Sequence, residues 1–272
     1  MTGHPFRGSS VRSDVLICAG LDPSGGAGLI ADVRVVSELG CRPVGVVTAL
    51  TVQNTTAVVS TEAVSAVLVR EQLELLLSDV EVRAVKIGMI GSSAVASSIA
   101  QALALTQAPV IWDPILHPSR GDVAFVDSLF GHAVIALAPH LTLLTPNAGE
   151  LTFLAGKPIR SVTDARAAGQ ALAAKLQCAV LAKGGHLVDD GGWAREEAVD
   201  VLCFADRAEE LRLPRVPGGE HVHGTGCALS SAIAAHLAHG AELVEACRAA
   251  KAYVAAKIAA PTRPGRGAAA MV

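Results

Sequence analysis

The sequence predicts an α/β fold with a mostly parallel central sheet. Short apolar runs rich in Val, Ile and Leu alternate with longer segments of helical spacing along most of the chain, and many of these runs end at Gly or Pro. Of the 272 residues, 51% are apolar but only 3% are aromatic, a composition typical of Ala- and Leu-rich helices packed on a parallel sheet. Repeated strand-helix alternation predicts helices on both faces of that sheet.

The individual elements follow from local pattern, in chain order. We expect strands where a short apolar run is closed by Gly or Pro, at 15–19, 82–87, 110–112, 141–144 and 179–182, and a further strand in the β-branched run at 44–50. We expect helices where apolar residues recur with a period near 3.6, at 29–39, 67–77, 92–105, 163–176, 225–239 and 243–259. Between 188 and 222 the pattern changes to a turn followed by two antiparallel strands, 199–204 and 211–216, which predicts a small elaboration at one sheet edge.

The length favours one domain over two. We expect a disordered N-terminal tail over 1–13, a single domain over 14–260, and a flexible Pro-, Gly- and Ala-rich C-terminal tail over 261–272. Exposed Ala- and Val-rich strands near the edge elaboration make a homodimer an expectation as well.

Composition limits the partners. The net charge is −3 and no long basic block occurs, which argues against nucleic acid. No apolar stretch is long enough to span a bilayer, and residues 1–13 lack the apolar core of a signal peptide, so we expect a cytoplasmic protein without a membrane partner. The six cysteines form no CxxC pair and no zinc-ligand spacing, so we expect reduced thiols. A small molecule is the expected ligand.

One segment combines an anion cradle with a thiol. The run HGTGC at 223–227 leads into an apolar helix, so Gly224, Thr225 and Gly226 can turn backbone N–H groups toward one point at the positive end of the helix dipole. Cys227 then lies in the first helical turn, a position that lowers the pKa of a thiol and makes it a candidate base or nucleophile. The alternative is a glycine-initiated core helix with one small apolar Cys.

The residues just after each predicted strand are unusually polar or rich in Gly. Ligands bind at the carboxyl ends of strands in open parallel sheets, so these positions are expected to share one rim. They include Gly20, Asp22, Gln53, Met89, Asp113, Asn147, Glu150 and Lys183. Neither a GxGxxG with a downstream acidic residue after the first strand nor a GxxxxGK[ST] phosphate loop occurs, so a nucleotide would be held in another way.

Several of these residues have a chemical and a structural interpretation. Asp113 and Glu150 are candidate ligands for a hard cation such as Mg²⁺, but a turn before proline and a solvated helix face explain them too. Lys183 follows a buried strand, where it either meets an anion or extends to the surface. Asp22 either accepts hydrogen bonds from a substrate or closes an Asx-turn. For His186 and His223 we expect a structural role.

Taken together, these segments resemble the hydroxymethylpyrimidine and phosphomethylpyrimidine kinases of thiamine biosynthesis, in the ribokinase-like superfamily. The resemblance runs from about 15 to 259. It rests on AGLDPSGGAG at 19–28, TAL at 48–50 with QNT at 53–55, VKIGM at 85–89, DP at 113–114, TPN at 145–147 with Glu150, KGGH at 183–186, and HGTGC at 223–227. It implies a ribokinase-like three-layer α/β/α fold with ATP and Mg²⁺ as cofactors.

The resemblance also implies roles for the site residues. Asp22 and Gln53 would bind the aminopyrimidine, with Gly20 and Met89 lining its pocket. Asn147 and Glu150 would organise Mg²⁺ and the phosphates, with Asp113 nearby, while Lys183 and Lys251 would contact the ATP phosphates. Residues 224–227 would form an anion hole, with Cys227 in the place of the aspartate base of related sugar kinases.

The expected activity is transfer of the ATP γ-phosphoryl group to the pyrimidine hydroxymethyl group, followed by a second transfer onto the monophosphate. Thr51, where the family usually has an apolar residue, and the segment 115–120 depart from the family pattern, and a loop over 117–123 is a candidate lid. Two alternatives stay open. One is a pyridoxal kinase of the same fold, and the other is a pyrimidine-binding regulator that has lost catalysis.

Overall fold

The computed structural model describes residues 13–116, 130–185 and 196–271. The expectations for the N-terminal tail, the lid loop over 117–123 and His186 therefore fall on residues outside the described ranges, except that Ser13 is described.

In the described part of the chain, a central sheet of nine strands forms the core of the fold. In spatial order its strands are β3 (Val58–Ala63), β2 (Arg42–Gln53), β1 (Asp14–Leu21), β4 (Val82–Ile87), β5 (Val110–Trp112), β6 (Leu143–Leu144), β7 (Ala179–Ala182), β8 (Glu197–Cys203) and β9 (Ala208–Pro214). The strands from β2 to β7 pair in parallel, whereas β3, β8 and β9 add antiparallel pairs at the two edges. This confirms the predicted α/β fold and the 199–216 elaboration, and adds β3 as a second antiparallel edge.

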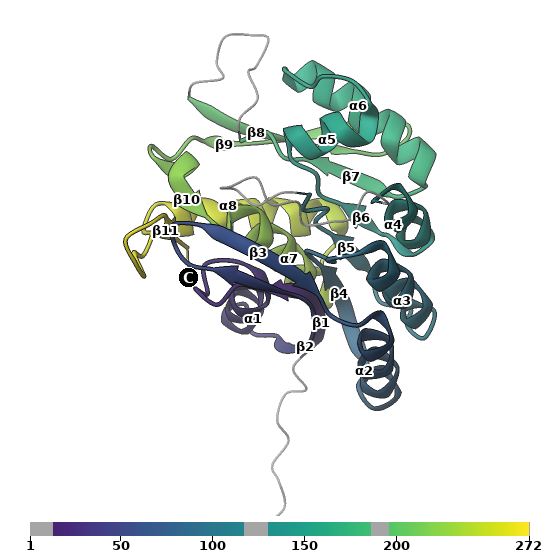
Figure 1. Ribbon diagram of the computed structural model, residues 1–272. Helices are drawn as coiled ribbons and strands as arrows, with labels where there is room; N and C mark the ends of the chain where they lie inside the picture. Colours follow the sequence, from purple (N-terminus) through teal and green to yellow (C-terminus); the bar gives the residue numbers. More distant parts are fainter. Residues whose placement is uncertain (1–12, 117–129, 186–195, 272) are drawn as a thin grey trace, which may run out of the picture.

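Helices cover both faces of the sheet (Figure 1). One face carries α2 (Ala66–Asp79), α3 (Ser93–Leu103), α4 (Phe130–Leu137), α5 (Ala148–Ala155) and α6 (Val162–Leu176), and the other carries α1 (Gly28–Glu38), α7 (Thr225–Ala238) and α8 (Leu243–Ile258). The three-layer arrangement is therefore as expected. The short 3₁₀ helices η1 (Ala138–His140) and η2 (Gly219–His221) connect elements of the domain.

Strand β1 shows why the central strands read as continuous apolar runs. Leu16 and Cys18 face the core under α2 to α6, while Val15, Ile17 and Ala19 face the core under α1, α7 and α8. All five are at most 1% exposed, so both faces of the strand need apolar side chains. Among the described helices, none has the length and hydrophobicity that a membrane span requires.

The segment expected to be a flexible C-terminal tail packs on the domain instead. Within it β11 (Ala269–Ala270) pairs in parallel with β10 (Val222–His223), and the Thr262 N–H donates to the carbonyl of Ala270 at 2.8 Å. Ala269, Ala270 and Met271 are buried. Composition suggested mobility because Gly, Pro and Ala are common in tails, but small residues also allow the close packing seen here.

That segment also reaches the turn after β2. The backbone N–H groups of Gly267 and Ala268 donate to Thr55 Oγ1 at 3.2 Å and to the Thr55 carbonyl at 3.0 Å. A Cβ atom on Gly267 would fall 1.7 Å from the Thr55 carbonyl oxygen, so only glycine fits at this position. Residues 262–271, which we call the C-terminal strap, thus join the β2–β3 turn to β10.

Candidate active site

The carboxyl ends of β1 and β4 lie at the point where the strand order reverses. The chain runs from β1 outward to β2 and then returns to place β4 on the other side of β1. Open α/β sheets bind ligands at this kind of switch point. Around it the structure gathers residues from several loops into two sides, one charged and one largely apolar.

The charged side consists of Asp113, Glu150 and Lys183, which we call the charged cluster. Lys183 Nζ lies 2.5 Å from Asp113 Oδ1 and 3.9 Å from Glu150 Oε2. The Asp113 carboxylate also accepts a hydrogen bond from Thr145 Oγ1 at 3.2 Å. Both carboxylates are buried, so the position after β7 brings Lys183 to two acidic groups rather than to open solvent.

Asn147 holds Glu150 in place by capping α5. Asn147 Oδ1 accepts from the Glu150 N–H at 2.9 Å, and Glu150 Oε2 accepts from the Asn147 N–H at 2.7 Å, which is a capping box. Burial, together with the nearby Asp113, outweighs the attraction of Lys183 and raises the pKa of Glu150 to about 7. Glu150 therefore changes its charge near neutral pH in the absence of a bound cation.

The anion loop, Gly224 to Cys227, adjoins this cluster. Gly224 has φ +84°, and a Cβ atom there would fall 2.1 Å from the carbonyl oxygen of Gly26. A Cβ atom on Gly226 would lie 3.1 Å from Lys183 Nζ and 3.5 Å from Asp113 Oδ2. Gly226, in the first turn of α7, thus lies against the charged cluster, so the partial positive charge of the helix terminus is close to the charge of Lys183.

Cys227 is in the first turn of α7, as expected, but the expected lowering of its pKa is wrong for the free site. Burial raises the pKa of the Cys227 thiol to about 12, although the positive charge of Lys86 and a hydrogen bond with the Gly28 backbone oppose the shift. The sequence placed the thiol at a helix terminus correctly but did not reveal that its side chain would be almost fully buried.

The apolar side is centred on Gly20 and Met89. A Cβ atom on Gly20 would lie 2.9 Å from Met89 Sδ, so the two predicted pocket residues touch. Met89 packs with Ala49, Val58 and Ile115, and its carbonyl accepts a hydrogen bond from Thr48 Oγ1. These four residues form a small apolar cluster beside Gly20.

Asp22 and Gln53 lie on the same side. Asp22 Oδ1 accepts from Ser24 N at 2.8 Å and Oδ2 from Ala27 N at 3.1 Å, so the carboxylate shapes its own loop, and His223 Nε2 lies 3.6 Å away. Burial acts to raise the pKa of Asp22, but His223 and Ser24 outweigh it and the pKa lies below its usual range. Gln53 Oε1 is 3.3 Å from Thr51 Oγ1, which also donates to the Leu21 carbonyl at 2.9 Å.

Lys251 is paired outside the charged cluster. Its Nζ lies 2.7 Å from Asp200 Oδ2, while Asp200 Oδ1 accepts from the backbone N–H of Gly184 at 2.8 Å. Asp200 thus connects Lys251 to the backbone of Gly184, the residue that follows Lys183. A contact between Lys251 and ATP stays a prediction.

Two buried residues near the site had no predicted role. Lys86 on β4 and Asp32 on α1 form an ion pair whose side chains are 0% exposed. The available signal was a lysine in the middle of the apolar strand run VRAVKI, where an unpaired charge is costly.

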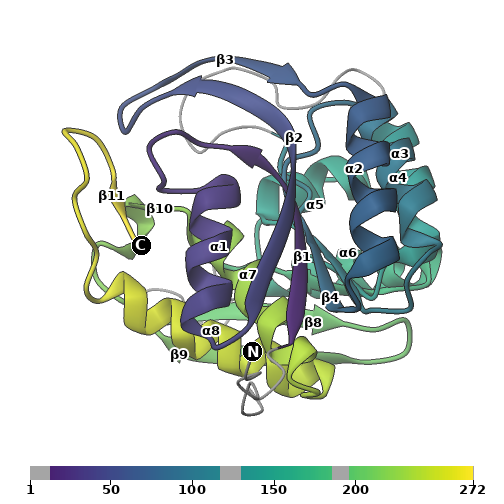
Figure 2. The same cartoon turned by 90° about the horizontal axis from the view of Figure 1, so that it is seen from below.

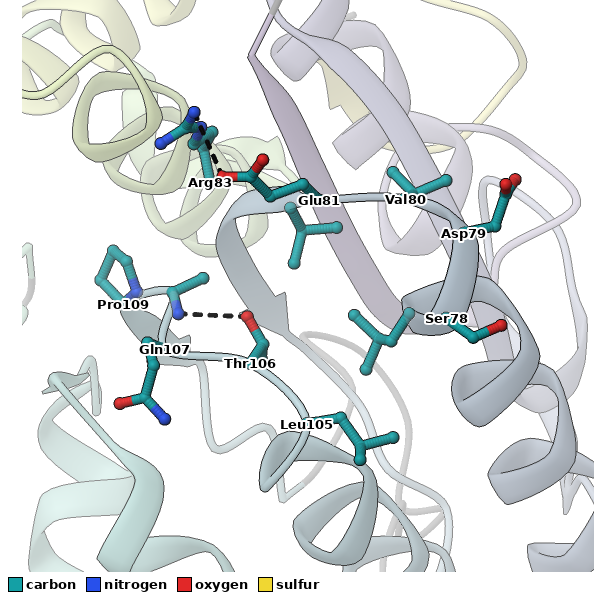
Figure 3. Close-up of a pocket in the computed structure, with 12 residues that line it drawn as sticks. Ser78, Asp79, Val80, Glu81, Arg83, Leu105, Thr106, Gln107 and Pro109 are labelled. Carbon is teal, nitrogen blue, oxygen red and sulfur yellow. Dashed lines mark hydrogen bonds and ion pairs between the residues drawn. The ribbon is translucent and has the colours of Figure 1, made fainter.

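The hollow in Figure 3 lies away from these residues. It has a volume of about 550 Å³ and is lined by residues 77–83, between α2 and β4, and 105–109, between α3 and β5. These loops lead into the amino ends of β4 and β5, whereas the charged cluster lies at the carboxyl ends of the parallel strands. Arg83 there pairs with Glu81 at 3.2 Å, and the hollow contains none of the predicted site residues.

Asp113 and Glu150 are the predicted metal ligands. Among the described residues no group of three or more His, Cys, Asp or Glu side chains is arranged to hold a metal ion. Mg²⁺ usually takes only one or two carboxylates and completes its shell with water and phosphate oxygens. Asp113 and Glu150, both within 4 Å of Lys183 Nζ, fit that pattern.

The chain is similar to known proteins over most of its length. The family model described as phosphomethylpyrimidine kinase matches residues 22–272. A hydroxymethylpyrimidine/phosphomethylpyrimidine kinase from Streptomyces coelicolor is 38% identical over 253 residues, covering 93% of this chain and 91% of that protein.

Two solved structures extend the comparison. The phosphomethylpyrimidine kinase from Clostridium difficile is 32% identical with a TM-score of 0.76, covering 91% of this chain and all of that one. An ADP complex of Bacillus subtilis pyridoxal kinase is 28% identical with a TM-score of 0.79, covering 93% of each chain.

Proposed function

The chain belongs to the phosphomethylpyrimidine kinase family, and on that premise we propose that it phosphorylates 4-amino-5-hydroxymethyl-2-methylpyrimidine and then the resulting monophosphate, with ATP as donor. The observation that carries the proposal is the meeting of the anion loop with the charged cluster at Gly226. Phosphoryl transfer has a loose transition state whose charge lies on the equatorial oxygens, so amides and cations directed at one point supply most of the acceleration.

The two sides of the site would bind the two substrates. Gly20, Met89, Asp22 and Gln53 would hold the pyrimidine ring, and Asn147, Lys183 and Lys251 would bind or orient the ATP phosphates. Asp113 and Glu150 would hold Mg²⁺, which supplies neutralisation of the phosphate charge when bound. ADP in a relative that is 28% identical supports the nucleotide assignment.

Cys227 would act only in the first transfer. The substrate hydroxyl oxygen forms a bond to the γ-phosphorus, the bond from that phosphorus to the leaving ADP oxygen breaks, and the hydroxyl proton passes to Cys227 Sγ as thiolate. The second acceptor is already an anionic phosphate and needs no base. The raised pKa of the free thiol means that positive charge near Sγ has to favour the thiolate.

Product analysis tests the reaction. Purified protein, Mg·ATP and the hydroxymethylpyrimidine are expected to give the monophosphate and then the diphosphate, detected by mass spectrometry. Pyridoxal is the second acceptor to compare, because a pyridoxal kinase shares 28% identity and the fold. Pyridoxal phosphate as the sole product would overturn the pyrimidine assignment.

The base assignment has its own test. Cys227→Ala is expected to slow the first transfer roughly 10²-fold or more and the second less than about threefold, measured with each acceptor separately. Equal losses would reject Cys227 as the base. A homodimer and a cytoplasmic location also remain predictions, the first testable by light scattering.

A further inference from the structure

A fully buried lysine lies beneath the anion loop. Lys86 Nζ on β4 is 2.5 Å from Asp32 Oδ2 on α1, and both side chains are 0% exposed. Removing two charges from water costs several kcal/mol per ion, and a buried pair is often replaceable by apolar residues without loss of stability. Stability alone therefore does not explain why Lys86 and Asp32 are buried together.

Helices α1 and α7 lie side by side (Figure 2). Ser231 Oγ on α7 donates to Asp32 Oδ1 on α1 at 2.8 Å, so the ion pair is joined to α7. Ser231 is one turn beyond Cys227, so helix periodicity places both side chains on the same face of α7.

Lys86 and the Cys227 thiol influence each other electrostatically. Burial works to lower the pKa of Lys86, but Asp32, Cys227 and Asp113 outweigh it, so the pKa is raised and the side chain stays an ammonium ion. The same ammonium is the strongest influence opposing the raised pKa of Cys227, ahead of the contrary influence of Asp32. Because Lys86 is 0% exposed and Cys227 only 8% exposed, screening by water between the two groups is weak.

We propose that Lys86, Asp32 and Ser231 form a positioning unit for Cys227. Asp32 and Ser231 hold the Lys86 ammonium against α7, and that ammonium favours the thiolate that accepts the substrate proton. The inference rests on the proposed function, in which Cys227 is the base of the first transfer.

A double-mutant cycle tests this unit. Lys86→Met combined with Asp32→Asn removes both charges at nearly constant volume. The kcat for the hydroxymethylpyrimidine is expected to fall roughly tenfold, which corresponds to one pKa unit of the thiol, while the kcat for the monophosphate falls less than about twofold. In the Cys227→Ala background the same two substitutions are expected to change the first transfer less than about twofold, because both changes act through one residue.

A second readout needs no catalysis. The alkylation rate of Cys227 by iodoacetamide at fixed pH follows its thiolate fraction, and peptide mass spectrometry measures it. The paired substitution is expected to slow alkylation of Cys227 roughly tenfold. The half-buried Cys178 serves as the internal reference, and its rate should not change.

Leu73→Ala is the control for general destabilisation. Leu73 lies on α2 in the core on the other face of the sheet, so this variant should lower Tm without changing the ratio of the two transfer rates. Where the paired variant does not fold, Ser231→Ala is the milder change, with an expected two- to threefold effect in the same direction.

Losses that add to those of Cys227→Ala, or an unchanged alkylation rate of Cys227, would overturn the positioning unit. Equal slowing of both transfers by Cys227→Ala would instead reject the base assignment. Slower alkylation in the paired variant would still support the effect of Lys86 on the thiol in that case.

Discussion

The two sides of the candidate site are held in place by different kinds of interaction. On the charged side, Asp113, Glu150 and Lys183 hold one another through ion pairs and a helix cap. On the apolar side, Gly20 and Met89 fit by close packing, and the carboxylate of Asp22 is engaged by its own loop. Changes of charge should therefore damage ATP use, and changes of shape should damage use of the pyrimidine.

The largest expected effect is on the charged side. Lys183→Met leaves Asp113 and Glu150 without their cation and removes positive charge beside Gly226. We expect kcat/KM for ATP to fall about 10²- to 10³-fold while KM for the pyrimidine changes less than about threefold. Steady-state kinetics with each substrate varied measures both. Lys157→Met, at an exposed lysine, is the matched control, and equal damage to both KM values would remove the distinction between the sides.

A smaller effect concerns pH. Glu150 has a pKa of about 7 in the folded chain against an ordinary value of 4.5, so with rising pH the unfolded state loses its proton before the folded state does. The contribution of Glu150 to the free energy of unfolding is therefore full below about pH 4.5 and is lost as the pH rises through 7.

Glu150→Gln should remove this trend. Urea unfolding without nucleotide at pH 5, 6, 7 and 8 is expected to show the variant gaining stability relative to the parent as the pH rises, by ~1–3 kcal/mol in total. A difference that stays constant with pH would mean that Glu150 is already ionised at pH 5.

The shape of the apolar side is tested by Gly20→Ala. The added methyl group would meet Met89 Sδ at 2.9 Å and push it toward the pyrimidine position. We expect a roughly tenfold higher KM for the pyrimidine, about 1.4 kcal/mol, with KM for ATP unchanged. Combining it with Met89→Ala should restore part of the loss, whereas a rise confined to KM for ATP would contradict the division into two sides.

The smallest effect is expected at Thr51. Thr51→Val removes the hydrogen bond to the Leu21 carbonyl at 2.9 Å, for a loss of about 1 kcal/mol in the free energy of unfolding and less than about a threefold change in KM for the pyrimidine. Comparing the kcat/KM ratio of pyrimidine to pyridoxal in both proteins shows whether the hydroxyl affects the choice of acceptor. No change in Tm would show that the bond contributes nothing.

The division into a charged side and an apolar side also explains which parts of the site could be predicted from the sequence. The charged cluster was predictable because residues after parallel strands meet at one edge, and the structure brings Asp113, Glu150 and Lys183 together there. Helix α5 was not among the expected helices, although a helix face was one interpretation of Glu150 and Asn147 and Glu150 have the spacing of a capping box. Their capping role and their proposed binding role use the same side chains.

Other features depend on contacts that no local pattern contains. Strand β3 has an exposed, mixed polar sequence typical of an edge, so its apolar signal is weak. The ion pairs of Lys86 with Asp32 and of Lys251 with Asp200 join residues far apart in the chain. The burial that raises the pKa of Cys227 likewise comes from surrounding elements rather than from its own helix turn.

The C-terminal strap contains backbone amides whose hydrogen exchange depends on the turn after β2, next to the apolar side of the site. Gly267 and Ala268 donate their amide protons to Thr55, two positions after Gln53. Each time that turn loosens, those amides become free to exchange with solvent deuterium. Hydrogen exchange at Gly267 and Ala268 should therefore slow when the pyrimidine binds, so two residues near the C-terminal end of the described chain report on an event at the turn after β2.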